Sequence, residues 1–165
     1  MCFATAGCTV PGAKILCPGR QAVVVTPTSS TAGTLTMFER EEKSSPWRQQ
    51  GSPVPVSLGS GGLAAGRGKR CGLPAKTEGD GRTPVGTYPL GPAFGRPASF
   101  PTRMPYLRIN LHTEAVDDSA SRFYNRIVDR RRVATPDWKS SEEMFRSDHL
   151  YDLGSVVGYN TKPAR

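Results

Sequence analysis

The sequence has few histidines, few aromatic residues and no long hydrophobic run. Its 165 residues include two histidines, and aromatic residues make up 8 % of the chain. The longest apolar runs, such as 22–25, end after a few residues, whereas a membrane-spanning helix needs about 20. We therefore expect no transmembrane segment. Because the aromatic residues are not interleaved with basic ones, the sequence also disfavours a platform for single-stranded nucleic acid.

Acidic residues are missing from the first 20 positions, a segment that holds three of the four cysteines: Cys2, Cys8 and Cys17. Glycine and proline interrupt every apolar run there, so the segment lacks the apolar stretch of a signal peptide. We interpret residues 1–20 as a non-native leader, a shortened export signal or a disordered arm. Residues 21–165 have a length typical of one domain.

The cysteines follow none of the common metal-binding spacings. Five residues separate Cys2 from Cys8, eight separate Cys8 from Cys17, and Cys71 lies far beyond them. Zinc ligands usually come in more closely spaced pairs. We therefore expect no metal site and no cofactor. The clustering of three cysteines in one arm argues against a disulfide framework.

Glycine and proline are abundant, with 18 and 15 residues, while the hydrophobic fraction is only 36 %. This composition indicates a small, loop-rich fold and not a helical bundle. Short β-branched or alternating segments predict strands at 21–26, 34–40, 54–58, 106–112 and 155–159. The first two would form a hairpin, and the third would be an edge strand beside Pro53. In the fourth, Leu107, Ile109 and Leu111 would share the buried face.

One segment favours a helix. Ser140 and Glu143 have the spacing of a capping box, and apolar residues follow until Gly154, a residue type that often ends helices. We therefore predict a mainly β fold with one short helix within 140–154.

The densest signal lies at 76–91, where turn-forming residues surround Lys76, Asp80 and Arg82. Glycine and proline at this density fix tight turns, so we expect these side chains to lie on a rigid loop. The segment begins Lys76-Thr77-Glu78-Gly79-Asp80-Gly81-Arg82-Thr83-Pro84-Val85-Gly86-Thr87-Tyr88. It resembles the Thr-Pro-x-Gly-x-(Phe/Tyr) segment of the L,D-transpeptidase (YkuD-like) catalytic domain, most closely the branch with Lys-x-Glu-Gly-Asp-Gly-Arg-Thr-Pro.

The resemblance covers about residues 21–160. Its further matching positions are Trp47, Val56–Gly59, Gly62–Leu63, Gly66–Gly68, Val116–Asp118, Ser121, Tyr124–Arg126, Trp138, Glu142, Met144, Leu150–Tyr151 and Tyr159–Asn160. It implies a β-sandwich enzyme of bacterial peptidoglycan remodelling that works outside the cytoplasm. In that family a cysteine thiolate, generated by a histidine base, attacks a stem-peptide carbonyl, and an amine of a second stem or water resolves the acyl-enzyme.

The resemblance implies peptidoglycan stem peptides as partners and places Tyr124, Asn125 and Arg126 beside the substrate groove, although a packing role for Tyr124 is an equal alternative. It assigns no catalytic residue to this chain. The family's histidine and Gly-Cys segment would follow Asn160, but Thr161–Arg165 contain neither residue type. We expect the sandwich to be incomplete at its C-terminus and the chain to be inactive. It would be a fragment, a degenerate relative, or a part completed by another polypeptide.

The remaining cysteine and the two histidines offer a weak substitute for that catalytic segment. Cys71 lies among four basic residues that would favour its thiolate. Nothing in the sequence brings His112 or His149 to it. Each histidine is better interpreted as a solvated or hydrogen-bonded side chain.

Charged residues suggest one alternative function. The adjacent Asp117 and Asp118 would point to opposite faces of an extended segment, so we expect one of them to pair with Arg126 and not to form a catalytic carboxylate pair. The run Arg130–Arg132, together with Arg126 and Lys139, could contact phosphates. The alternative is thus a non-catalytic basic module that binds cell-wall polymer or nucleic acid, in a chain whose net charge is +8.

Overall fold

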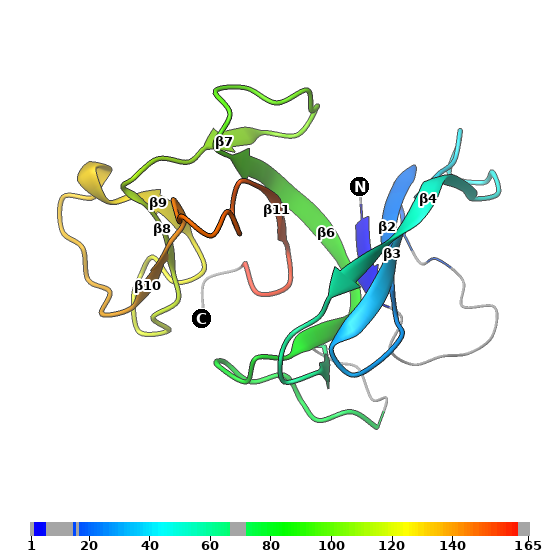
Figure 1. Ribbon diagram of the computed structural model, residues 1–165, viewed down its shortest axis with the longest axis horizontal. Helices are drawn as coiled ribbons and strands as arrows, with labels where there is room; N and C mark the ends of the chain where they lie inside the picture. Colours follow the sequence, from blue (N-terminus) through cyan, green and yellow to red (C-terminus); the bar gives the residue numbers. More distant parts are fainter. Residues whose placement is uncertain (1, 6–14, 16, 67–71, 162–165) are drawn as a thin grey trace. The chain divides into compact units, whose positions relative to one another are not determined.

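A computed structural model describes residues 2–5, 15, 17–66 and 72–161 of the chain. These residues form eleven strands and one short 3-10 helix, so the prediction of a mainly β fold is confirmed. The chain divides into two compact units, Met1–Leu90 and Gly91–Arg165. Strand β6 (Thr83–Gly95) contributes its first part to unit 1 and its last part to unit 2 (Figure 1).

Unit 1 holds a sheet in the order β6-β1-β2-β3-β4, with β5 beside β6. Its other strands are β1 (Cys2–Thr5), β2 (Gln21–Pro27), β3 (Ala32–Glu39), β4 (Arg48–Ser57) and β5 (Leu63–Ala65). β1 lies within the segment interpreted above as a leader or an arm, and it pairs with both β2 and β6. The predicted hairpin is confirmed, because β2 and β3 pair antiparallel from Gln21–Glu39 to Pro27–Gly33.

A small buried cluster lies beside the hairpin of unit 1. Cys17 and Ala22 are buried, and Ile15, Phe38 and Trp47 pack against them. Cys17 is disulfide-bonded, a bond that the clustering of cysteines in the sequence did not favour. The structure thus ties the chain just before β2 to the hairpin through apolar contacts.

Strand β4 is the edge strand of this sheet, as Pro53 predicted, and it is longer than the predicted 54–58. Val54 lies opposite Leu35 of β3. A proline nitrogen cannot donate a hydrogen bond to a neighbouring strand, so Pro53 and Pro55 direct their nitrogens away from β3. The prolines therefore interrupt the outer edge of the sheet.

Unit 2 contains two groups of strands. Alongside the last part of β6 lie β7 (Tyr106–Arg108) and β11 (Leu153–Val157). An antiparallel sheet has the order β10-β8-β9, formed by β8 (Thr113–Val116), β9 (Ile127–Asp129) and β10 (Ser141–Glu143). Phe94, Ile109 and Met144 form the buried core. β11 begins and ends slightly before the predicted 155–159.

The predicted strand at 106–112 is wrong in its second half, because the chain turns after Ile109. The Asn110 amide donates to Thr113 Oγ1 at 2.9 Å, and the Thr113 amide donates to the Asn110 carbonyl at 2.9 Å. Ile109 is 1 % exposed, whereas Leu107 and Leu111 are 39 % and 75 % exposed. Local hydrogen bonds of asparagine and threonine thus override the alternating pattern.

The predicted helix at 140–154 is also wrong. Ser141–Glu143 is strand β10, which pairs with β8, and Ser140 Oγ donates to Asp117 Oδ1 at 2.5 Å instead of capping a helix. The 3-10 helix η1 (Arg130–Arg132), capped by Asp129, is the one helical segment in the described ranges. Accordingly, no helix of the described part is long and apolar enough to cross a membrane.

Candidate functional site

The residues predicted to border the substrate, Tyr124, Asn125 and Arg126, lie in the connection between β8 and β9 of unit 2. Two backbone hydrogen bonds close this connection. The Asn125 amide donates to the Val116 carbonyl at 2.9 Å, and the Val116 amide donates to the Arg126 carbonyl at 3.0 Å. Asn125 has a φ of 59°, a left-handed conformation that asparagine tolerates better than most residues.

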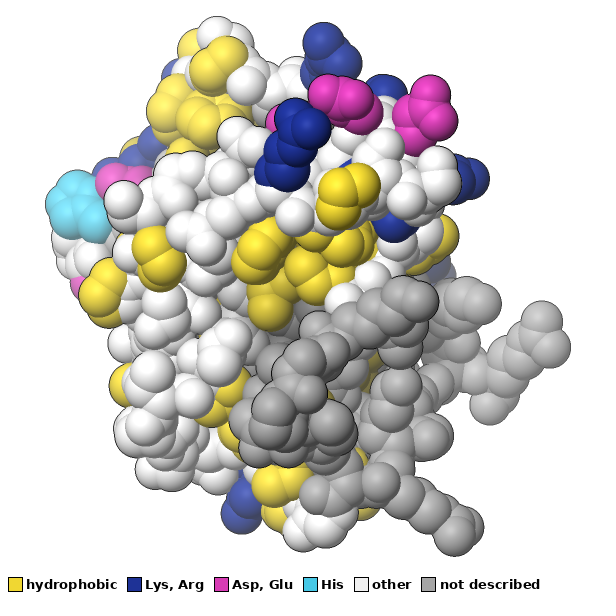
Figure 2. Space-filling view, turned by 90° about the vertical axis from the view of Figure 1, so that its right-hand side faces the viewer, with side chains coloured by type: hydrophobic (Ala, Val, Ile, Leu, Met, Phe, Trp, Pro, Cys, Tyr) yellow, Lys and Arg dark blue, Asp and Glu magenta, His cyan; other side chains and the backbone are white. Residues whose placement is uncertain are grey.

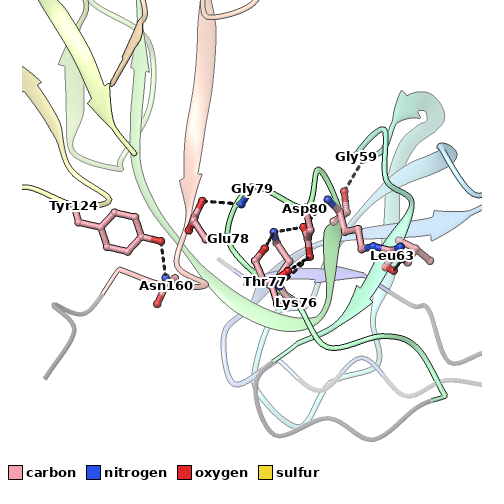
Figure 3. A network of polar contacts seen from close by, with 11 residues as sticks. Gly59, Leu63, Lys76, Thr77, Glu78, Gly79, Asp80, Tyr124 and Asn160 are labelled. Carbon is pink, nitrogen blue, oxygen red and sulfur yellow. Dashed lines mark hydrogen bonds and ion pairs between the residues drawn. The ribbon is translucent and has the colours of Figure 1, made fainter. Parts of the chain in front are cut away.

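Asn160 joins this turn through its side chain and its backbone. Asn125 Nδ2 donates to the Asn160 carbonyl oxygen at 2.6 Å. Asn160 Nδ2 donates to the Tyr124 hydroxyl at 3.3 Å, a contact that Figure 3 shows. We call Tyr124, Asn125 and Asn160 the Tyr–Asn cluster. Tyr124 is half-buried and Asn125 is exposed. The sequence placed Asn160 within the resemblance but not in the site, because only the fold brings it to Asn125.

The aspartates next to this turn are occupied by local contacts. Asp118 accepts hydrogen bonds from the Lys139 and Ala120 amides at 2.8 and 2.9 Å, which hold the pKa of Asp118 below its usual value. Asp117 accepts from Ser140. Within the described ranges, these two carboxylates bind Ser140 and backbone amides and form no ion pair with Arg126, so that prediction is wrong. The two backbone amides already stabilise the charged form of Asp118, so an ion pair with an arginine side chain is not required.

Ser121, in the same connection between β8 and β9, is buried, but its hydroxyl is already paired. Its Oγ donates to Asp137 Oδ1 at 2.6 Å and accepts from the Phe123 amide at 3.0 Å. The hydrogen bond from Ser121 is the main reason that the pKa of Asp137 lies below its usual value. A hydroxyl that donates to a carboxylate and lacks a histidine base is a structural group, not a nucleophile.

Residues 76–82 of unit 1 form a loop, as the sequence predicted, whereas the prediction of tight turns is wrong for 83–91, which belong to strand β6. The Asp80 carboxylate accepts hydrogen bonds from Lys76 Nζ and from the amides of Thr77 and Arg82, both at 2.9 Å (Figure 3). Lys76 Nζ is the main cause of a pKa of Asp80 far below its usual value. Gly79 and Gly81 have φ values of 71° and 63°. These positive values explain why glycine stands on both sides of Asp80.

Two further contacts fasten this loop to its surroundings in unit 1. Arg82 Nη1 donates to the Leu63 carbonyl at 3.2 Å, and the Gly59 amide donates to Thr83 Oγ1 at 2.8 Å. The Lys76 and Asp80 side chains are only 18 % and 13 % exposed. With the Lys76 ammonium group and two backbone amides around it, Asp80 is a structural carboxylate that holds the loop, and it is not free to act as a general base.

The two histidines lie in exposed turns. His112 is exposed, and its backbone amide donates to Asn110 Oδ1 at 2.8 Å. His149 has a φ of 64°, and its Nδ1 lies 2.8 Å from Asp152 Oδ2. The interpretation of His149 as a hydrogen-bonded side chain is confirmed. Cys71 lies outside the described residues. Nothing in the described ranges groups three or more His, Cys, Asp or Glu side chains as a metal site would.

The basic run Arg130–Arg132 is largely engaged by acidic neighbours. Arg131 binds Asp129 through Nε at 3.1 Å and Nη2 at 2.7 Å, which holds the pKa of Asp129 well below its usual value. Arg130 Nη1 lies 3.5 Å from Glu114 Oε2. Two of its three arginines therefore lie beside a carboxylate, and the run is not a continuous basic stripe. On the face that Figure 2 presents, which is the right-hand side of Figure 1, basic and acidic side chains also lie next to one another.

The described side chains of this region offer groups that can form hydrogen bonds with a ligand, but they do not form an acyl-transfer centre. The Tyr–Asn cluster supplies amide and hydroxyl groups that hydrogen-bond to peptides, and it lies beside the exposed Arg126 in sequence. No family model, curated protein or solved structure matches this chain.

Proposed function

We propose that this chain is an L,D-transpeptidase-like protein that binds peptidoglycan stem peptides outside the cytoplasm and that the 165-residue polypeptide does not itself catalyse acyl transfer. The observation that carries the proposal is the segment Lys76–Pro84, whose residues match one branch of that family position by position. The mainly β fold is compatible with it.

The proposal that the chain does not turn over a substrate rests on the requirements of the reaction. A cysteine nucleophile needs a neighbouring base, and backbone N–H groups must receive the developing oxyanion. The two histidines of the sequence are His112 and His149. The imidazole of His149 pairs with Asp152, and His112 lies in an exposed turn. Neither position supplies a base held against a cysteine in the described ranges.

The binding test uses purified peptidoglycan and a soluble stem tetrapeptide. We expect the protein to be retained on peptidoglycan. Tyr124→Phe and Asn125→Asp should each weaken retention about fivefold, because each removes a hydrogen-bonding group of the Tyr–Asn cluster. Asn125→Asp keeps a residue that accepts the positive φ. The matched control is Tyr106→Phe. The hydroxyl that this variant removes donates to the Pro97 carbonyl elsewhere in unit 2.

Two results would contradict the proposal. One is binding to double-stranded DNA that falls steeply with salt, without retention on peptidoglycan, which would favour the nucleic-acid alternative. The other is turnover of the tetrapeptide by this polypeptide alone. Loss of that turnover in Cys71→Ala would show that the chain is itself an enzyme.

A further inference from the structure

Two arginines and two aromatic rings form a continuous row on unit 2. The Arg122 guanidinium carbon lies 5.0 Å from the Phe123 ring centroid, and the Arg130 guanidinium carbon lies 5.6 Å from the Trp138 ring centroid. The rings of Phe123 and Trp138 meet edge to face, with centroids 5.3 Å apart. We call these four residues the Arg–aromatic row. The sequence did not reveal it, since the rings are 15 positions apart along the chain.

The row holds each guanidinium group in a fixed orientation. Arg122 Nη2 donates to the Thr135 carbonyl and hydroxyl, both at 2.7 Å. Trp138 Nε1 donates to Glu114 Oε2 at 2.9 Å, which also lies 3.5 Å from Arg130 Nη1. A guanidinium group that lies over a ring can still direct its outer N–H groups toward planar oxyanions.

Both guanidinium groups remain accessible. The side chains of Arg122 and Arg130 are 58 % and 54 % exposed. Arg130 Nε and Nη2 have no hydrogen-bond partner in the described ranges, and neither does Arg122 Nη1. Arginine binds carboxylates through two parallel N–H groups better than lysine does, because its donors are planar and pre-oriented.

The neighbours of the row decide which anion it fits. Glu114 and Asp137 lie within 3.5 Å of its arginines, and they interrupt the positive field that a nucleic-acid backbone requires. The guanidinium groups also lie over the Phe123 and Trp138 rings, on which the bases of a nucleic acid would need to stack. A peptide with separate carboxylates, by contrast, can be bound by separate guanidinium groups and does not require a continuous positive surface.

We propose that the Arg–aromatic row binds the free carboxylates of a peptide and that, resting on the function proposed above, this peptide is the peptidoglycan stem. Phe123 directly precedes Tyr124 of the Tyr–Asn cluster in the sequence. The Tyr–Asn cluster would hydrogen-bond to uncharged amide groups of the ligand, while the row selects its charge.

The test compares a stem tetrapeptide that has free carboxylates with the same peptide after amidation, by isothermal titration calorimetry. We expect amidation to weaken binding to the wild-type protein about tenfold or more. The double variant R122K/R130K keeps both charges but loses the planar donors, so it should lose the same factor for the free peptide and nothing for the amidated one. Arg103→Lys, an exposed arginine of unit 2 without a ring contact among the described residues, is the matched control.

The outcomes separate this inference from the proposed function. Equal affinity for both peptides, or an unchanged R122K/R130K, overturns the inference while binding to peptidoglycan stands. Failure of both peptides and of peptidoglycan to bind overturns both. Binding of duplex DNA that R122K/R130K weakens, without peptide binding, assigns the row to nucleic acid instead. Circular dichroism melting curves confirm that each variant is folded, so that a loss reports on the row.

Discussion

At the scale of single residues, the Asp80 carboxylate accepts hydrogen bonds from the Lys76 ammonium group and from two backbone amides of its own loop. A carboxylate that accepts several hydrogen bonds is stabilised in its charged form. Its folded-state pKa lies far below the usual value. The side chain therefore contributes stability above the ordinary aspartate pKa of about 3.9, and this contribution is lost as the pH falls toward the folded-state pKa.

Asp80→Asn should lower the melting temperature of the protein at pH 7 by several degrees, because the amide cannot pair with the Lys76 charge. The difference from the wild type should shrink as the pH falls below about 4, because the carboxylate is then protonated in the unfolded chain while it stays charged in the folded protein until still lower pH. Glu42→Gln, at an exposed position of unit 1, is the control. An equal melting temperature for Asp80→Asn and the wild type at pH 7 would contradict a structural role for this carboxylate.

Tyr151 provides a second test at this scale. Burial, together with the hydrogen bond that its hydroxyl donates to Glu142, raises the pKa of Tyr151 to about 12. Ultraviolet titration should show one of the five tyrosines ionising late. Glu142→Gln should bring this pKa closer to the ordinary value of about 10. Because the folded-state pKa is the higher one, Tyr151 contributes stability below pH 10 that is lost as the pH rises toward 12.

At the scale of secondary-structure elements, strand β4 is an exposed edge of the unit 1 sheet. Unpaired N–H and C=O groups on such an edge can pair with another chain. Pro53 and Pro55 are at alternate positions, so both missing N–H groups lie on the same outer side. The two prolines therefore limit edge-to-edge association.

The double variant P53T/P55T should self-associate, because threonine restores two outward N–H groups and favours strands. Light scattering should show a larger particle size than for the wild type at the same concentration. Pro46→Thr, in the connection before β4, leaves the edge unchanged and should stay like the wild type. If P53T/P55T also scatters like the wild type, the prolines do not protect the edge.

The elements also show where sequence patterns suffice. The hairpin of β2 and β3 could be predicted because β-branched runs flank one turn-forming segment. The segment at 140–143 could not, because capping-box residues are equally able to hydrogen-bond elsewhere. In the fold, Ser141 and Glu143 lie opposite Val116 and Glu114 in a sheet. Pairing with a strand distant in the sequence decided the conformation, and no local pattern contains that information.

At the scale of the whole molecule, several aspartates have lowered pKa values for the same reason. Hydrogen bonds or ion pairs hold the pKa values of Asp80, Asp118, Asp129, Asp137 and Asp148 below the usual range. Each binds its proton more weakly in the folded state than in the unfolded chain. Unfolding therefore becomes more favourable as the pH falls through about 4.

The urea midpoint should thus fall clearly between pH 5 and pH 3. Added salt should reduce the part of this effect that comes from exposed pairs such as Arg131–Asp129. A midpoint that is constant or higher at pH 3 would mean that these carboxylates are not held in their charged form by the fold.

The candidate site was only partly predictable from the sequence. The resemblance singled out Tyr124, Asn125 and Arg126, and the glycine pattern predicted the loop at 76–82 but not strand β6, which follows it. The sequence did not reveal the hydrogen bonds of Asn160 or the contact between Trp138 and Phe123, because these contacts join segments that are distant along the chain.

Nuclear magnetic resonance titration of the isotope-labelled full chain with a stem tetrapeptide tests the central claim most directly. If the chain binds stem peptides at the proposed site, the amide signals that shift should cluster at 122–126, 130, 138 and 160, with saturation as the peptide is added. Shifts confined to other segments, or none at millimolar peptide, would contradict the account.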